Sequence, residues 1–112
     1  MLHITQAERD GTLMISLSGE LDHHAARGIR EAIDAAVDRD MPTLLILDFG
    51  EVTFMDSSGI GLVMGRYRKL QQTGAELHVA NTPPHIYKVM KLAGLEKLAK
   101  LEKGGERHET RQ

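Results

Sequence analysis

Apolar and polar residues alternate on either side of a short polar turn near the amino terminus. The turn reads Arg9-Asp10-Gly11-Thr12, and Asp-Gly is a preferred hairpin turn. A period of two is typical of strands with one buried face, so residues 2–18 are predicted to form a β-hairpin whose first strand lies at a sheet edge. The alternating apolar positions are Leu2, Ile4, Leu13, Ile15 and Leu17.

The spacing of apolar residues then changes to three and four, which is typical of a helix with one buried face. Asp22 is the expected N-cap of this helix, and Met41-Pro42 is expected to end it after Asp40. The chain therefore passes from the hairpin into a long amphipathic helix. The positions on its apolar side are Ala25, Ala26, Ile29, Ile33, Ala36 and Val37.

An uninterrupted apolar run, Leu44-Leu45-Ile46-Leu47, follows this helix. Such a run is typical of a central strand in a parallel sheet that is covered on both faces. A connection from Asp48 to Met55 is expected to lead into a second helix with Ser57 as its N-cap, and Arg66 falls on the polar side of that helix. Its apolar side carries Ile60, Val63, Met64, Tyr67 and Leu70.

The rest of the chain repeats the alternation of strands and helices. Residues 76–80 are predicted to form another strand, and Pro83-Pro84 opens a third helix. Residues 95–101 suit a helical turn by propensity or a short strand by alternation, and the strand is favoured. Such repeats build parallel βαβ units with right-handed crossovers. We predict a single-domain α/β fold: a mixed four- or five-stranded sheet with an N-terminal hairpin and parallel βαβ units flanked by helices. The domain spans 1–102, and 103–112 form a flexible polar tail.

Composition narrows the function classes. The 112 residues are 41% hydrophobic and 27% charged, with a formal net charge of -2, so no direct binding to nucleic acid or to a membrane surface is expected. The chain has no cysteine, which excludes disulfides, thiolate zinc sites and thiol catalysis. No signal sequence and no run of roughly 20 apolar residues is present, so a cytoplasmic protein is expected.

The segment Phe54-Met55-Asp56-Ser57-Ser58-Gly59-Ile60-Gly61 places two adjacent hydroxyls at the start of the second predicted helix. A helix start offers unpaired N–H groups and a partial positive charge, which suit oxygen acceptors. Glycines at positions 59, 61 and 65 cost roughly 1 kcal/mol each relative to alanine within a helix. Either close packing on the sheet or the close approach of another molecule explains them.

Parallel strands bring the loops that follow them to one edge of the sheet, so Asp22 and Ser57 are expected to be neighbours. An acidic rim would then surround the serines. Such a rim is a poor cradle for nucleotide phosphates, but it suits Mg²⁺ or a basic partner. The rim residues are Glu20, Asp22, Asp48 and Asp56.

Enzyme signatures are incomplete in this sequence. Asp22-His23-His24 is similar to an element of metal-dependent phosphoesterases, but further ligands are missing and the two histidines are expected to point in divergent directions. The Gly-x-Ser-x-Gly turn of serine hydrolases and the glycine-rich phosphate loop are also missing. We expect no enzymatic activity, no cofactor and no bound metal.

Three segments together resemble a known family. Gly19-Glu20-Leu21-Asp22-His23-His24, the segment 54–61 and Gly65-Arg66-Tyr67 closely resemble the SpoIIAA-like anti-sigma factor antagonists of the STAS domain family. The likeness runs from about residue 2 to residue 101. It weakens at the end, where the family's C-terminal helix is shortened or replaced by a polar tail.

The resemblance implies a partner-switching protein of transcription regulation in sporulation or the stress response. The implied partners are an anti-sigma factor with serine kinase activity, which phosphorylates Ser57, and a PP2C-type phosphatase, which restores it. A monomer or weak dimer is expected. The residues expected at the partner contact are Glu20, Asp22, His23, Asp56, Ser57, Ser58, Gly59, Ile60 and Arg66.

Two alternatives stay open at this point. A STAS domain can serve another assembly, such as a stress-signalling scaffold or a lipid-transport complex, in which the serine need not be phosphorylated. A small metal-dependent phosphoesterase would use Asp22, His23 and His24, and predicts metal-dependent turnover by the purified chain.

Overall fold

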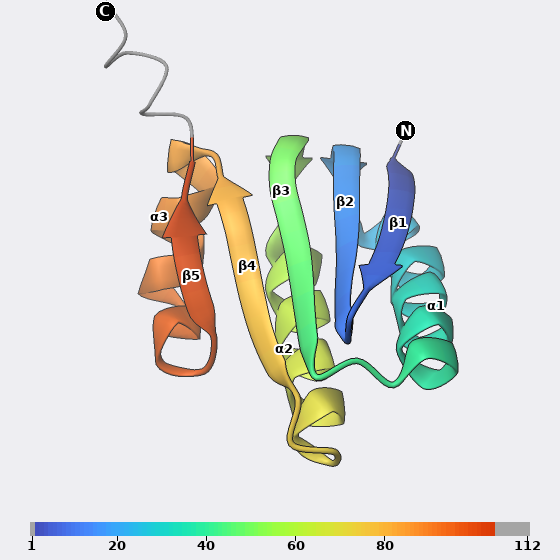
Figure 1. Cartoon of the computed structure of the whole chain (residues 1–112). Helices are drawn as coiled ribbons and strands as arrows, with labels where there is room; N and C mark the ends of the chain where they lie inside the picture. The colour runs from blue at the N-terminus through green and yellow to red at the C-terminus, as the bar shows by residue number, and fades with distance from the viewer. Residues whose placement is uncertain (1, 105–112) are drawn as a thin grey trace, which may run out of the picture.

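The strands of the chain form one mixed sheet in which they follow one another in sequence order (Figure 1). This architecture is that of a computed structural model, which describes residues 2–104. The strands are β1 (His3–Arg9), β2 (Thr12–Leu21), β3 (Leu44–Met55), β4 (Glu76–Thr82) and β5 (Lys100–Lys103). The helices are α1 (His23–Asp40), α2 (Ser57–Gln71) and α3 (Pro84–Leu92), with a 3-10 turn at Leu95–Lys97.

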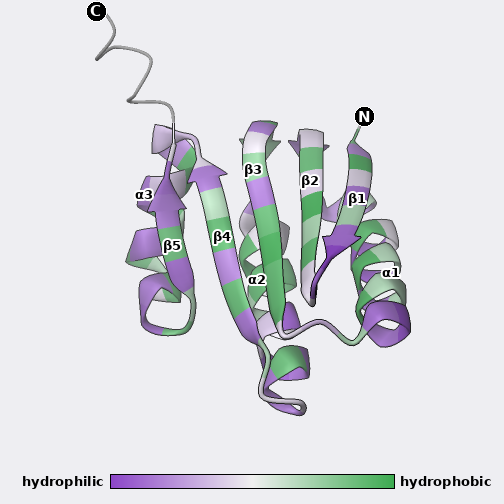
Figure 2. Cartoon of the chain, viewed as in Figure 1, coloured by the Kyte–Doolittle hydropathy of each residue, from purple (hydrophilic) through white to green (hydrophobic). Residues whose placement is uncertain are grey.

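The pairing of the strands confirms the predicted fold class. β1 and β2 are antiparallel and form the N-terminal hairpin, whereas the β2–β3, β3–β4 and β4–β5 pairs are parallel. β1 lies at one edge of the five-stranded sheet, as expected. β3 lies at the centre of the sheet, and β3 and its neighbour β2 carry most of the sheet's hydrophobic residues, while β5 is largely hydrophilic (Figure 2).

The helices α1, α2 and α3 all cover the same face of the sheet (Figure 1). This follows from the strand order, because successive right-handed crossovers that move in one direction place every helix on one side. The prediction that Leu44–Leu47 is covered on both faces is therefore wrong. Leu45 and Leu47 are fully buried under the helices, whereas Leu44 and Ile46 are only partly covered on the open face.

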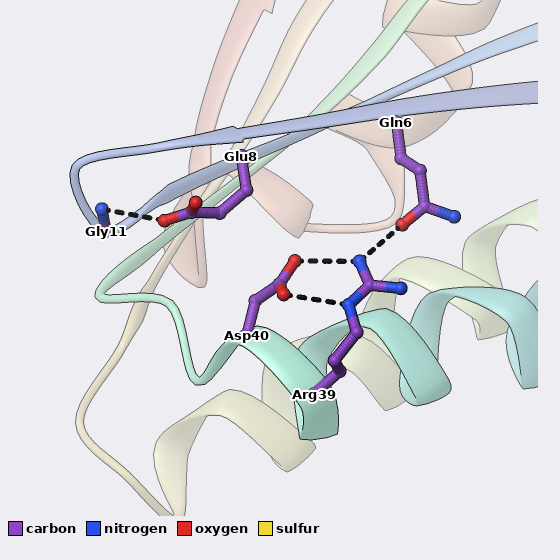
Figure 3. Close-up of polar contacts among 5 residues, drawn as sticks. All are labelled: Gln6, Glu8, Gly11, Arg39 and Asp40. Carbon is purple, nitrogen blue, oxygen red and sulfur yellow. Dashed lines mark hydrogen bonds and ion pairs between the residues drawn. The ribbon is translucent and has the colours of Figure 1, made fainter.

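Side chains at the end of α1 attach the hairpin to the helix layer (Figure 3). Arg39 donates to Gln6 Oε1 at 2.9 Å and also binds the Asp40 carboxylate at 2.8 and 2.9 Å. The Arg39 guanidinium lowers the pKa of the Asp40 carboxyl. The backbone N–H of Gly11 (φ 85°) donates to Glu8 Oε2 at 3.1 Å, which closes the hairpin turn.

β3 is longer than the sequence predicted, because its parallel pairing with β2 continues to Met55 through two irregularities. Asp48 therefore lies inside the strand, about 23 Å along it from Met55 at roughly 3.3 Å per residue. Its carboxylate accepts hydrogen bonds from Gly50 N at 2.8 Å and from Asn81 Nδ2 at 3.0 Å. The prediction that Asp48 belongs to an acidic rim around the serines is wrong.

The carboxyl-terminal part differs partly from the prediction. The segment 95–101 begins as a 3-10 turn rather than a strand, and only its end belongs to β5. β5 continues to Lys103, Gly104 is buried, and residues 105–112 of the expected tail lie outside the described residues. Within residues 2–104, no helix combines the length and apolarity needed to cross a membrane.

Candidate docking and modification site

The carboxyl ends of β2 and β3 bring two helix starts together. Leu21 and Met55 are paired in the parallel register, and Asp56 N donates to Leu21 O at 3.2 Å. Since α1 and α2 begin directly after these strands, their amino termini lie side by side. The prediction that Asp22 and Ser57, at these two helix starts, are neighbours is confirmed at the level of the backbone.

Both helix starts are capped by aspartate. Asp22 Oδ1 accepts from Ala25 N at 3.0 Å, as predicted for α1. In α2 the N-cap is Asp56 and not Ser57, so that prediction is wrong by one residue. Asp56 Oδ1 accepts from Ser58 N at 2.8 Å, while its Oδ2 accepts from His23 N at 3.2 Å. One carboxylate thus holds the two helix starts together.

The two serines differ in their surroundings because Asp56 takes the capping position. Ser57 is the first helical residue of α2, is exposed, and makes no side-chain hydrogen bond within residues 2–104. Ser58 is half-buried, and its hydroxyl interacts with Asp56 in addition to the backbone contact. Ser57 is therefore the more exposed of the two serines.

The Asp56 carboxyl has a lowered pKa. The main cause is the hydrogen bond from the Ser58 backbone N–H, with further contributions from the Ser58 hydroxyl and from His23, while burial opposes the shift. An ionised carboxylate is also favoured at a helix amino terminus. The site is therefore held together by a group that stays charged at neutral pH.

This lowered pKa predicts a loss of stability in acid. The ionised Asp56 stabilises the fold above the unfolded pKa of 3.8, and the contribution is lost as pH falls through the lower folded pKa. We expect Asp56→Asn to be less stable than the unchanged chain at pH 7, with the difference shrinking toward pH 3. Urea unfolding across this range measures the difference, and a constant gap would contradict the assignment.

The glycines of α2 have different structural roles. A Cβ on Gly59 would overlap the Met55 side chain and lie 3.3 Å from Leu21 Cδ2, so packing on the strand ends explains this glycine. Apart from the adjoining backbone of α2, a Cβ on Gly61 or Gly65 would meet no atom of the described residues within 4 Å. Internal packing therefore does not require these two glycines, although each weakens the helix by roughly 1 kcal/mol.

The residues expected at the partner contact differ in their exposure. The exposed ones are Glu20, His23 and Ser57. The half-buried ones are Asp22, Asp56, Ser58 and Ile60. Gly59 and Arg66 are buried, so both support the site from beneath its surface.

The prediction that Arg66 lies on the solvent side of α2 is wrong. It is 7% exposed, and its Nε lies 2.8 Å from Asp34 Oδ1 of α1 while its Nη1 donates to Leu62 O at 3.4 Å. Burial lowers the pKa of Arg66, the Asp34 carboxylate opposes this, and nearby Arg30 and Arg68 lower the pKa further. The Asp34–Arg66 pair fastens the two helices of the site to each other.

The prediction that His23 and His24 point in divergent directions is wrong. Their rings are in contact, with centroids 4.0 Å apart and an interplanar angle of 36°. His23 Nδ1 lies 3.9 Å from Asp56 Oδ2. Among the described residues, no three histidine, aspartate or glutamate side chains gather in an arrangement that would hold a metal ion.

An aromatic side chain and a basic groove lie at this site and were not among the predicted contact residues. Phe54 pairs with Glu20 at the end of the sheet and is 50% exposed. The sequence shows that Phe54 is close to the serines along the chain, but it did not predict that β3 is long enough to include Phe54. The groove lies between α1 and α2 and contains arginines, of which Arg27 and Arg30 stand three apart on α1. That spacing alone places them on one helix face.

Comparison with known proteins agrees with the fold and the motifs. The STAS domain family matches residues 3–106. The chain is 36% identical over 97 residues to an anti-sigma F factor antagonist of Paenibacillus polymyxa, covering 87% of this chain and 83% of that protein. It is 43% identical over 84 residues to an anti-sigma F factor antagonist of Lysinibacillus sphaericus, covering 75% and 72%.

Solved structures give the same result. The unphosphorylated form of the anti-sigma factor antagonist SpoIIAA has a TM-score of 0.79 and 34% identity, covering 96% of this chain and 93% of that one. The phosphorylated form of Bacillus SpoIIAA has a TM-score of 0.73 and 34% identity, covering 97% of each chain. The chain therefore belongs to the STAS domain family, among the SpoIIAA-like anti-sigma factor antagonists.

Proposed function

We propose that the chain binds an anti-sigma factor with serine kinase activity and thereby frees the sigma factor which that protein holds. Phosphorylation of Ser57 by the kinase ends the binding, and a PP2C-type phosphatase restores it. The chain acts by binding and carries out no catalysis of its own. This role is played in the cytoplasm.

The exposed hydroxyl at the start of α2 is the observation that carries this proposal. Ser57 is exposed and its side chain makes no hydrogen bond in the described part of the chain, whereas Ser58 is half-buried and engaged by Asp56. A kinase can therefore reach Ser57 without disturbing the cap of the helix. The names of the relatives support binding to an anti-sigma factor, and a related protein known in a phosphorylated form supports control by phosphorylation.

The electrostatics of the site explain why a phosphate would act as a switch. Phosphorylation adds roughly -1.5 to -2 charge and a bulky group. The amino terminus of α2 tolerates this charge within the chain. A partner docked over Ser57 would have to desolvate the phosphate beside Glu20, Asp22 and Asp56, which weakens binding by several kcal/mol when the partner's own nucleotide phosphates lie nearby.

The position of the phosphate tests the proposal. After incubation with the cognate kinase and ATP, mass spectrometry should find one phosphate, on Ser57. Ser58→Ala should still be phosphorylated, because it loses only the hydroxyl's interaction with Asp56 and keeps the backbone hydrogen bond, and Ser57→Ala should not be. Incubation with the phosphatase should return the unmodified mass. A phosphate on Ser58, or no phosphate on the unchanged chain, would refute the assignment.

A further inference from the structure

An open groove of about 540 Å³ runs between α1 and α2 beside the two serines. Ser58 lines the groove at the end nearest the helix starts, and His23 lies across from it on α1. The groove is separate from the acidic hollow formed by Glu20 and Asp22 on the other side of the first turn of α1. The basic residues that line it are Arg27, Arg30, Arg66 and Arg68.

The positive charge of this groove is only partly neutralised within the chain. Arg66 is paired with Asp34 below the surface, and Arg27 makes a contact of 3.5 Å with Glu31 in which both side chains are exposed. Arg30 and Arg68 are exposed and form no ion pair within residues 2–104. The charges of Arg30 and Arg68 both lower the pKa of Arg66, so these three cations lie close together. They do so although the whole chain has a net charge of -2.

The glycines of α2 leave the floor of the groove flat. Gly61 and Gly65 both line it, and a Cβ at either position would meet no atom within 4 Å. The fold gains nothing from their bare backbone, and helix propensity disfavours them. A molecule that lies directly on the α2 backbone would explain why both positions are glycine.

We propose that the α1–α2 groove is the docking site for an acidic polypeptide segment of a partner protein, which lies over Gly61 and Gly65 with its carboxylates on Arg30 and Arg68. Guanidinium groups bind carboxylates through paired, charge-assisted hydrogen bonds. The identity of the partner rests on the proposed function, in which it is the anti-sigma factor. Charge complementarity selects an acidic segment over a basic or apolar one.

This placement connects the groove to the switch. Ser57 directly precedes Ser58, which lines the groove, so a phosphate on Ser57 adds its negative charge at the end where the acidic segment would lie. The phosphate would repel the carboxylates of the segment and compete with them for the arginines. Phosphorylation would then weaken docking in the groove as well as contact at the serine.

The groove can be tested without the partner. We expect a hexaglutamate peptide, titrated into isotope-labelled chain, to cause saturable NMR shifts of backbone amides within 26–30 and 58–68. Peptide concentrations up to roughly 10 mM suffice, since a dissociation constant of about 1 mM would then be saturating. Shifts spread over α3 and β5, no shifts, or tighter binding of a single-stranded oligonucleotide of equal charge would each overturn the proposal.

Matched variants separate binding from folding. Arg30→Glu and Arg68→Glu should each weaken peptide binding about tenfold, whereas Lys88→Glu, the same charge change on α3, should not. Gly61→Ala and Gly65→Ala should raise the thermal midpoint yet weaken binding. Gly28→Ala serves as their control, because its Cβ would also meet no atom within 4 Å but the position faces the acidic hollow. Unchanged binding by the groove variants would refute the inference.

The same variants tested against the cognate kinase distinguish this proposal from the proposed function. Binding of the unchanged chain with about tenfold weaker binding by Arg68→Glu would support both. Equal binding by all variants would retain the function and overturn the groove. If the kinase binds none of the proteins but hexaglutamate binds in the groove, the proposed function fails and the docking site for an acidic segment stands.

Discussion

Replacing Ser57 with aspartate should weaken binding of the serine-kinase anti-sigma factor about 100-fold, whereas Ser57→Ala should bind as tightly as the unchanged chain. The expected loss corresponds to about 2.8 kcal/mol, at about 1.4 kcal/mol per tenfold change. Alanine removes a hydroxyl that makes no hydrogen bond with any residue from 2 to 104. Aspartate adds a negative charge to a surface that already carries Glu20, Asp22 and Asp56, and the cost appears when a partner desolvates it.

Folding should not account for this difference. A negative charge on the first residue of α2 is favourable to the helix, so the thermal midpoint of Ser57→Asp should equal or exceed that of the unchanged chain. Gln72→Glu places the same charge beyond the opposite end of α2 and should bind the kinase normally. Isothermal titration calorimetry in the presence of ADP measures all of these proteins, and equal affinities for the aspartate and alanine variants would count against the switch.

Asp34→Ala should lower the free energy of unfolding by about 2–3 kcal/mol, because it leaves the buried guanidinium of Arg66 without its counter-charge. This loss is smaller than is usual for a buried ion pair, because the Asp34 side chain is 29% exposed. Water can therefore partly take the place of the Asp34 carboxylate beside Arg66. Asp38→Ala is a matched control. Its ion pair with Lys69 also joins α1 to α2, but the Asp38 side chain is 68% exposed.

The control should cost no more than about 1 kcal/mol, as is usual for an exposed ion pair. Urea unfolding of the two variants at pH 7 measures the difference. A double variant, Asp34→Leu with Arg66→Met, should recover much of the lost stability, because an apolar pair of similar size needs no counter-charge. Equal costs for Asp34→Ala and Asp38→Ala would show that the Arg66 pair contributes no more than a surface contact.

The features that were predicted correctly depend on local signals. Asp10-Gly11 between alternating apolar residues defines the hairpin, and Asp22 before an amphipathic segment defines the start of α1. The meeting of Asp22 with Ser57 followed from topology, since neighbouring parallel strands end at one edge of the sheet. These inferences needed no knowledge of side-chain packing.

The features that were missed depend on contacts between distant residues. Asp56 replaces Ser57 as the N-cap because its second oxygen also binds the backbone of His23, a partner that a local pattern does not reveal. Arg66 is buried because Asp34 of another helix forms an ion pair with it. Asp48 lies away from the site because the pairing of β3 with β2 continues beyond it to Met55. In each case the deciding interaction joins separate elements.

The affinity of the anti-sigma kinase for two forms of the same chain tests the role of Ser57 most directly. One form is unmodified, and the other is phosphorylated to completion at that single residue. The unmodified form should bind at least about 100-fold more tightly, and phosphatase treatment should restore the affinity of the other. If the kinase binds both forms equally well, charge at the start of α2 does not control the partnership.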